Sequence, residues 1–565
     1  MKVRLSIIVQ DQAAAAVKGM RPVESFIVDR DEVFLDGPVS GRLAVIDLDP
    51  ATNRLRRGAR FQPPAGDRPG TYSIANETDF ESPDFMQVSV FGTVLRTMEM
   101  FEEADTLGRE LAWAFGAPQL LIVPRAGEWA NAFYERESHS LQFFHFPSKS
   151  DHNELATVYT SLSADIVCHE TGHAIVDGIA PDLYNAITPQ SLALHEAIAD
   201  LTALVMSFRS RTVRETVLQQ TDGSIEDSTA FTRLAEEFGA ALDPDRRRFY
   251  LRNLLNDRKL GDREVDETDP HDLSEVLTGA LYTVMVKLHE QEKRRLAEAE
   301  QISEYSASGK AIFIAAERFQ RMMFRALDYL PPGEISFADY GRAIIASDQA
   351  AHPDAPDGRR WICDEFVRRG IVANADALDV PSPREEPALG ELDLPTLIGS
   401  DWVAYDFANR HRELLGIPPT IPFEVRPRLK TRKREYHRDG PRDVVECLFK
   451  VAWRESEPNP GGRWFTDERQ ITGGTTLAIE WDEPPRVLRV CLTTRADDQR
   501  ESRDRMLLRL DDDSVLMPAR QATASDGHPL RSAIQAEIAG DSMRVRGTAR
   551  TLHVAPRERA STSGA

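Results

Sequence analysis

The sequence predicts an α+β protein in which a helix-rich block lies between two β-rich regions. Residues 1–80 alternate short apolar runs with Gly, Pro and Asp, which is typical of short strands and turns. Residues 81–373 contain long segments whose apolar positions recur at helical spacing, and residues 401–556 return to strand-like runs. At 565 residues the chain is too long for one ordinary core, so two or three domains are expected.

The N-terminal β-rich region, residues 1–80, begins with an alternating segment at residues 3–9 that predicts a strand. A helix is expected over residues 88–115, where Val94, Met98 and Phe101 fall on one face. A strand at residues 120–123 and an extended stretch at residues 131–146 should follow.

The helical block predicts four further helices and a broken fifth. The first covers residues 164–177, because Gly178 and Pro181 stop it. The others are expected over residues 192–208, 273–300 and 311–329, and residues 337–372 form a helix that is broken around 352–358.

The C-terminal part begins with a linker over residues 374–400, which is rich in Pro, Asp and Glu and has no sustained period. Residues 401–556 predict a β-rich accessory domain, with strand candidates at 444–445, 448–449, 475–481, 487–492 and 543–545. Residues 557–565 are expected to be a disordered tail. No internal repeat is visible.

Composition excludes several classes of protein. A net charge of -22 and a pI near 5.2 disfavour a dedicated nucleic-acid or anionic-membrane binder, so neither partner is expected. The basic run at 426–438 has one aromatic residue and is interpreted as a solvated linker or strand edge. The first residues lack the apolar core of a secretory signal, and no window resembles a membrane span. Because the four cysteines form no CxxC pair, unpaired thiols and a cytoplasmic location are expected.

The predicted helix at 164–177 carries the sequence His169-Glu170-Thr-Gly-His173. Four residues are just over one helical turn, so His169 and His173 project from the same face and can share one metal ion. Glu170 lies beside them and can reach a water rather than the metal itself. On its own this motif also fits a surface helix with two histidines.

The next predicted helix contains Glu196 and Asp200, again four residues apart. Two such carboxylates usually form a solvated stripe, but nearly all their neighbours here are apolar, so the helix is expected to be buried. A buried carboxylate needs a partner, and a metal supplies one. Glu196 completes a His2Glu zinc site with an open fourth position, and Asp200 can accept the other ring N–H of a ligand histidine.

HExxH followed on the next helix by ExxxD resembles the signature of the thermolysin-like peptidases of the gluzincin clan, and the resemblance spans residues 85–372. It implies a thermolysin-like peptidase domain at 81–373, with a β-rich N-terminal lobe and a helical lobe. It also implies one catalytic zinc ion and a peptide or protein substrate. Internal peptide bonds would be hydrolysed by a metal-activated water with Glu170 as general base.

The resemblance implies further site residues. Residues 131–134, Asn-Ala-Phe-Tyr, are similar to the family's edge strand, so Asn131 and Ala132 would bind the substrate backbone. Tyr184 has the family's spacing from the second ligand for the tyrosine that stabilises the oxyanion. An alternative role for Tyr184 is to cap a loop.

Two more segments resemble the family's catalytic regions. His271 matches the second catalytic histidine, and Asp266 is the position that would pair with it, although a histidine after Asp-Pro is often only a helix cap. Arg252 resembles the arginine that contacts the substrate carbonyl, with a surface salt bridge as the alternative.

The sequence also departs from the family. His195 stands where the family has Asn, and an imidazole can make a similar hydrogen bond to a ligand. Asp165 matches a calcium-linked position, but Ser207 replaces an acidic ligand, so calcium is not expected at the family's double site. The family's secretion signal and inhibitory propeptide have no counterpart, and the composition is similar to that of bacterial proteins.

We therefore expect a zinc endopeptidase that is intracellular and narrow in specificity, or gated by a regulatory partner or by autoinhibition through the C-terminal domain. One alternative is a non-catalytic zinc-binding protein that kept the peptidase fold. Another is an aminopeptidase of the same clan, but the Gly-x-Met-Glu-Asn motif of those enzymes is missing.

Overall fold

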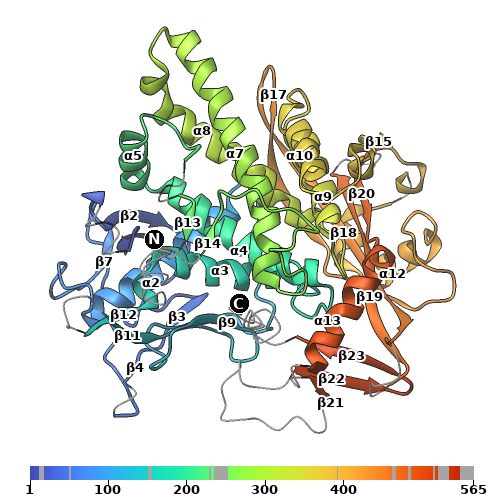
Figure 1. Cartoon of the computed structure of the whole chain (residues 1–565), viewed down its shortest axis with the longest axis horizontal. Coiled ribbons are helices and arrows are strands. Elements are labelled where there is room, and N and C mark those ends of the chain that lie inside the picture. The colour runs from blue at the N-terminus through green and yellow to red at the C-terminus, as the bar shows by residue number, and fades with distance from the viewer. Residues whose placement is uncertain are drawn as a thin grey trace, which may run out of the picture.

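The structure is a computed structural model that describes residues 1–11, 15, 18–49, 52–149, 155–227, 229, 231–234, 252–390, 392–460, 466–481, 485, 487–512, 516–518 and 534–547. The protein is a mixed helix and strand structure, which is compatible with the predicted α+β class (Figure 1). The tail predicted at 557–565 lies outside the described residues.

Two four-stranded sheets form most of the N-terminal region, and they include strands close to those predicted at residues 3–9 and 120–123. The first has the order β2-β1-β7-β6 and consists of β1 (Lys2–Ile8), β2 (Val23–Asp29), β6 (Phe61–Gln62) and β7 (Gly70–Tyr72). The second has the order β3-β8-β10-β9 and consists of β3 (Leu43–Val45), β8 (Leu120–Val123), β9 (Ala132–Glu135) and β10 (Ser140–Phe143). Strand β9 is therefore an edge strand of this sheet.

Three two-stranded pairs accompany these sheets. They are β4 (Leu48–Asp49) with β5 (Arg54–Leu55), β11 (His145–Lys149) with β12 (Leu155–Tyr159), and β13 (Arg233–Leu234) with β14 (Arg252–Asn253).

The predicted helices are all present and pack one against the next. They are α2 (Pro83–Glu102), α3 (Ala164–Ile179), α4 (Pro189–Arg209), α7 (Pro270–Glu300), α8 (Glu304–Tyr329), α9 (Phe337–Ala351) and α10 (Asp357–Arg368). The pair α7 and α8 projects from the top of the molecule in Figure 1. A short helix that the sequence pattern did not predict, α5 (Arg211–Gln220), follows α4. The helix predicted to reach residue 115 ends at Glu102 instead. The chain then turns through Gly108, which has a positive φ of 64° and lies against the backbone of Arg432.

Helix α4 is apolar almost all round because it lies in the core, where 19 of its residues are buried. By length and composition it could cross a membrane, yet the whole of that window is buried inside the protein. This is weak evidence for a membrane span, because core helices meet the same criteria.

The C-terminal region is built on a nine-stranded sheet with the order β15-β20-β19-β23-β22-β21, in which β18 joins β19 to β16 and β17. Its strands are β15 (Arg384–Glu385), β16 (Phe423–Val425), β17 (Leu429–His437), β18 (Gly440–Pro458), β19 (Glu468–Glu480), β20 (Val487–Thr493), β21 (Leu516–Pro518), β22 (Ile534–Ala539) and β23 (Ser542–Arg546). Three helices that the strand-like pattern did not predict accompany the sheet, namely α11 (Leu394–Gly399), α12 (Asp401–Arg410) and α13 (Arg500–Asp512). The expected linker at 374–400 contains β15 and α11, so it is partly ordered.

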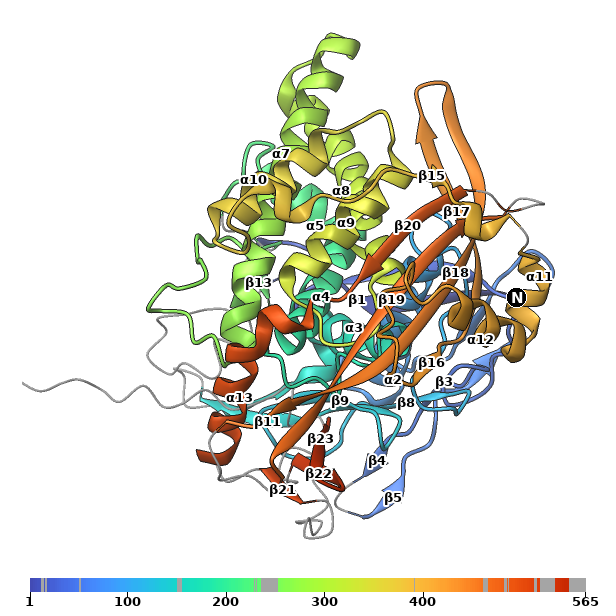
Figure 2. The same cartoon turned by 90° about the vertical axis from the view of Figure 1, so that its right-hand side faces the viewer.

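This sheet lies against the helical block (Figure 2). One hydrophobic cluster runs from β1 through the central helices to Met506 on α13 and Val545 on β23. The C-terminal region therefore shares part of the main core, and a second cluster between α11, α12 and the sheet gives it a core of its own.

A buried ionic cluster joins α8 to the same sheet. Lys433 Nζ lies 3.0 Å from an Asp328 oxygen and 3.7 Å from a Glu446 oxygen, and Arg325 lies 3.4 Å from Glu446. All four side chains are at most 1% exposed. The basic run at 426–438 thus forms β17 and sends at least one lysine into the core.

Candidate metal centre

Helices α3 and α4 approach each other closely at a glycine. A Cβ atom on Gly172 would lie 2.9 Å from Ala199 Cα and 3.0 Å from the Thr202 hydroxyl. A larger residue would therefore push the helices apart. Gly172 lies next to His173, so this contact also sets the distance between the histidines on α3 and Glu196 on α4.

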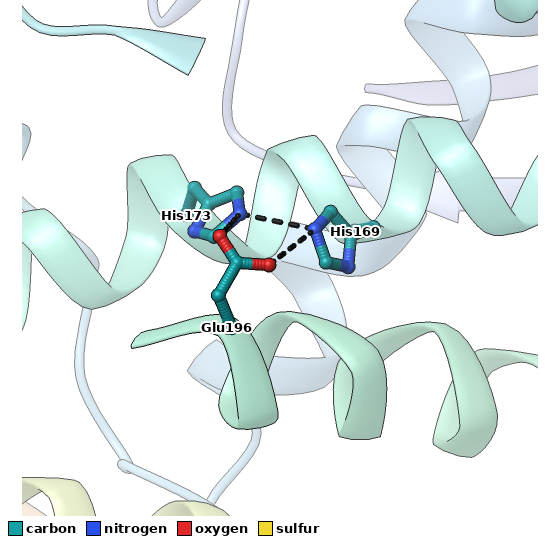
Figure 3. A group of neighbouring side chains, drawn as sticks. All are labelled: His169, His173 and Glu196. Carbon is teal, nitrogen blue, oxygen red and sulfur yellow. Dashed lines mark hydrogen bonds and ion pairs between the residues drawn. The ribbon is translucent and has the colours of Figure 1, made fainter. Parts of the chain in front are cut away.

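Three side chains meet between these helices (Figure 3). The Nε2 atoms of His169 and His173 lie 3.0 Å apart, and each is 3.4 Å from one oxygen of Glu196. The three candidate ligand atoms lie within 4.8 Å of one another, and all three residues are buried. This group can hold a metal ion.

The environment of Glu196 fits a metal. Its side chain is fully buried, and the contacts that the described residues make to its carboxylate oxygens are imidazole nitrogens at 3.4 Å, longer than an ordinary hydrogen bond. Burial works against the charged form, but His271, His173 and His169 hold its pKa well below the usual range. A buried anion facing two imidazoles is the donor set of a His2Glu site.

The remaining nitrogens of both histidines have partners. Asp200 Oδ1 lies 2.9 Å from His169 Nδ1, and His195 Nδ1 lies 2.7 Å from His173 Nδ1. Such outer contacts fix the orientation of a ligand ring. They leave the Nε2 atoms of both rings turned toward Glu196.

Arg252, on β14, donates to Asp200 Oδ1 from Nε at 3.0 Å and from Nη2 at 2.7 Å. Arg252 is only 10% exposed and Asp200 is fully buried. The expected alternative for Arg252 was a surface salt bridge, but the observed pair is buried and lies beside a metal-ligand candidate. The predicted contact with substrate stays a prediction.

Glu170 follows His169 on α3 and is 4% exposed. Its Oε2 accepts a hydrogen bond of 2.9 Å from the backbone N–H of Tyr134 on β9. Burial raises its pKa to about 7, against the opposing effect of His169. A carboxylate with this pKa can accept and release a proton near neutral pH.

The segment predicted to bind substrate lies at the start of the edge strand. Ala132 is the first residue of β9, and Asn131 precedes it. The Asn131 side chain accepts a 2.8 Å hydrogen bond from the Ala132 N–H. Strand β9 packs on α3, so an extended ligand added to its edge would pass close to Glu170.

Tyr184 lies in the loop between α3 and α4 and is fully buried. Its hydroxyl lies 3.5 Å from Glu135 Oε1, and the guanidinium of Arg136 lies over its ring at 4.2 Å. Its ring centroid is 6.2 Å from that of His195, which places it one layer behind the candidate ligands.

His271 is the second residue of α7. Its Nε2 lies 3.4 Å from Glu196 Oε2, and its Nδ1 lies 3.6 Å from Asp269 Oδ1. Its side chain is 27% exposed, more than any of the three ligand candidates. Asp266, its predicted partner, accepts from the backbone N–H and the hydroxyl of Thr268 at 2.9 and 2.7 Å, and the Asp266–His271 pair stays a prediction.

The C-terminal region also reaches the site, which the sequence did not predict. The backbone N–H of Gly547, just after β23, donates to the Asn185 side chain at 3.2 Å, and a Cβ on Gly547 would lie 1.8 Å from the Tyr184 carbonyl oxygen. Arg509 on α13 donates to the Thr268 hydroxyl at 3.0 Å. No local pattern in the sequence joins segments more than 200 residues apart.

A scan against protein-family models finds no family that matches the chain. A search of curated proteins finds no match either.

Proposed function

We propose that the protein is a zinc-dependent endopeptidase of the thermolysin-like type, with His169, His173 and Glu196 as metal ligands. The arrangement of Glu170 carries this proposal. This carboxylate is adjacent to a ligand, is fixed by the edge strand and has a pKa near 7. A purely structural metal site has no use for such a group, whereas hydrolysis needs one.

The chemistry divides between the metal and the protein. When bound, zinc supplies positive charge that polarises the scissile carbonyl and acidifies the attacking water. Glu170 accepts the proton of that water and transfers it to the leaving amine. The hydrogen bond from the Tyr134 N–H holds the carboxylate in place during both transfers.

Two further side chains are proposed to stabilise the oxyanion. His271 is the better placed, because its ring contacts Glu196 and is partly exposed to an incoming substrate. Tyr184 would need to turn away from Glu135 before its hydroxyl could donate to a substrate, because both groups are buried. Burial raises the pKa of Tyr184 well above its usual value, so this hydroxyl stays a donor.

The substrate is proposed to be an extended peptide or protein segment that pairs with β9 through Asn131 and Ala132. Arg252, which lies beside His169 and Asp200, would orient it. We further propose a cytoplasmic protease of narrow specificity, since an unrestricted protease would damage its own cell.

Mass spectrometry of the peptides released from an unstructured protein, with zinc quantified in the same sample, tests the proposal. The proposal expects about one zinc per chain and cuts at internal bonds. Stepwise loss of N-terminal residues would indicate an aminopeptidase instead. Bound zinc with no cleavage of any peptide would favour a non-catalytic binding protein.

A further inference from the structure

Arg509 on α13 contacts the loop that leads into α7. Its Nη1 donates to the Thr268 hydroxyl at 3.0 Å and lies 3.5 Å from Asp266 Oδ2. Its Nη2 lies 3.9 Å from Asp269 Oδ2. One side chain from the C-terminal region therefore contacts three of the four residues at 266–269.

Asp269 connects this contact to His271. Its Oδ1 accepts a 2.9 Å hydrogen bond from the His271 backbone N–H, which caps α7, and lies 3.6 Å from His271 Nδ1. The other oxygen faces Arg509. The ring of His271 then contacts Glu196 with its far nitrogen. The four side chains form a continuous series from the C-terminal region to the candidate metal ligands.

Arg509 and Arg505 lie on the same helix but differ in how deeply they are buried. Arg509 and Asp269 are 2% and 3% exposed, so water screens their attraction poorly. Arg505, one turn earlier, pairs with Glu267 at 2.8 Å, but these side chains are 54% and 27% exposed. Exposed ion pairs contribute little to stability. The Arg505–Glu267 pair should therefore hold the loop before α7 in place far less than the Arg509–Asp269 pair does.

We propose that Arg509 is a positioning residue for His271, acting through Asp269. The C-terminal region then contributes to the geometry of the active site and is not an independent accessory domain. The catalytic consequence rests on the proposed peptidase function, whereas the positioning itself does not. Removing this region would then lower the activity, whereas removing an autoinhibitory region would raise it.

The test compares Arg509→Met with Arg505→Met, which makes the same substitution on the same helix. Modification of His271 by diethyl pyrocarbonate, followed by peptide mapping of the metal-free protein, reports the freedom of the ring without requiring activity. We expect faster modification in Arg509→Met, a rate equal to the parent's in Arg505→Met, and partial restoration in Arg509→Lys. An equal rate in all four proteins would overturn the proposal.

Kinetics supply the second measurement. Loss of a preorganised oxyanion donor costs about 10²–10³-fold in kcat, so a misplaced donor should cost at least about tenfold. We expect this fall in Arg509→Met with KM and zinc content unchanged, and less than about a twofold change in Arg505→Met. Zinc loss together with a fall in Tm would instead indicate a structural role and overturn the positioning role.

Asp269→Asn gives an independent check, because asparagine keeps the helix cap but removes the charge. If Arg509 acts through Asp269, the double variant Arg509→Met/Asp269→Asn is no slower than the worse single variant. Additive losses would contradict the route through Asp269. If the parent cleaves nothing, the peptidase proposal fails, and the modification rates still decide whether Arg509 positions His271.

Discussion

Replacing Asp200 with Asn should lower both the metal affinity and the stability of the protein, because Asp200 contacts a proposed metal ligand and a buried cation. Asp200 Oδ1 lies 2.9 Å from His169 Nδ1 and accepts two hydrogen bonds from Arg252. The same oxygen thus orients a proposed ligand and neutralises a buried cation. The substitution keeps the shape of the side chain and removes its charge.

The expected losses of metal affinity and of stability can be estimated separately. Changing a carboxylate that orients a ligand histidine typically lowers metal affinity by about 10–100-fold. Leaving a buried cation without its partner costs about 3 kcal/mol of the free energy of unfolding of the metal-free protein. Arg252 is 10% exposed, so solvent cannot fully replace the lost carboxylate.

The double variant Asp200→Asn/Arg252→Met distinguishes these effects. It removes the unpaired cation, so we expect most of the lost stability to return while the metal affinity stays low. Competition with a zinc-binding dye measures the affinity, and urea unfolding with chelator present measures the stability. A parent-like affinity in Asp200→Asn, or a restored affinity in the double variant, would refute the assigned role of Asp200.

Three further predictions concern pH and metal. Burial lowers the pKa of Lys450 from 10.5 to about 8, so the unfolded chain binds more protons between these values and the stability rises with pH there. Relative to Lys450→Met, the parent should gain up to about 3 kcal/mol between pH 8 and 10.5 in urea unfolding, and a constant difference would contradict this. Burial opposes protonation of His169, but Asp200 and Glu196 raise its pKa to about 9, so metal affinity should fall about tenfold for each pH unit below that value. Calorimetry in two buffers should accordingly detect about one proton released at pH 7, and equal heats in both would argue against it. Zinc at 100 times its dissociation constant should stabilise the protein by about 2.7 kcal/mol over the chelated form, and a Tm independent of zinc would exclude binding at a folded site.

The candidate metal ligands could be predicted from the sequence because helix geometry fixes their relative positions locally. Residues four apart on one helix share a face, so His169 and His173 had to project together once α3 formed. Glu196 required one more step, namely that an apolar helix buries its carboxylates and must supply them with partners. The glycine between the two candidate ligands, Gly172, is a further visible signal, because it allows the close approach of α3 and α4.

The contacts around the ligands could not be predicted as fully because they join distant segments. Asp200 was expected to meet a histidine, but the buried pair with Arg252 depends on where β14 lies. Lys433 belongs to a run that looked solvated, and its partners Asp328 and Glu446 lie elsewhere in the sequence. Charge alone does not reveal burial when the partners are remote.

The C-terminal region could also be predicted only in part, because its packing joins distant segments of the chain. Its central strands followed from their alternating pattern, whereas α13 is so rich in charge that its buried Met506, Leu507 and Leu510 gave no clear signal. Its packing against the loop before His271 arises only from the tertiary fold.

The most direct test of the peptidase proposal is cleavage of an internally quenched peptide by the parent and by Glu170→Gln, with bound zinc measured in both. The proposal predicts about one zinc per chain in each protein and cleavage by the parent alone, because the amide cannot accept the proton of the attacking water. Equal cleavage rates in the two zinc-loaded proteins would contradict the role of Glu170, and absence of zinc from both would contradict the metal site itself.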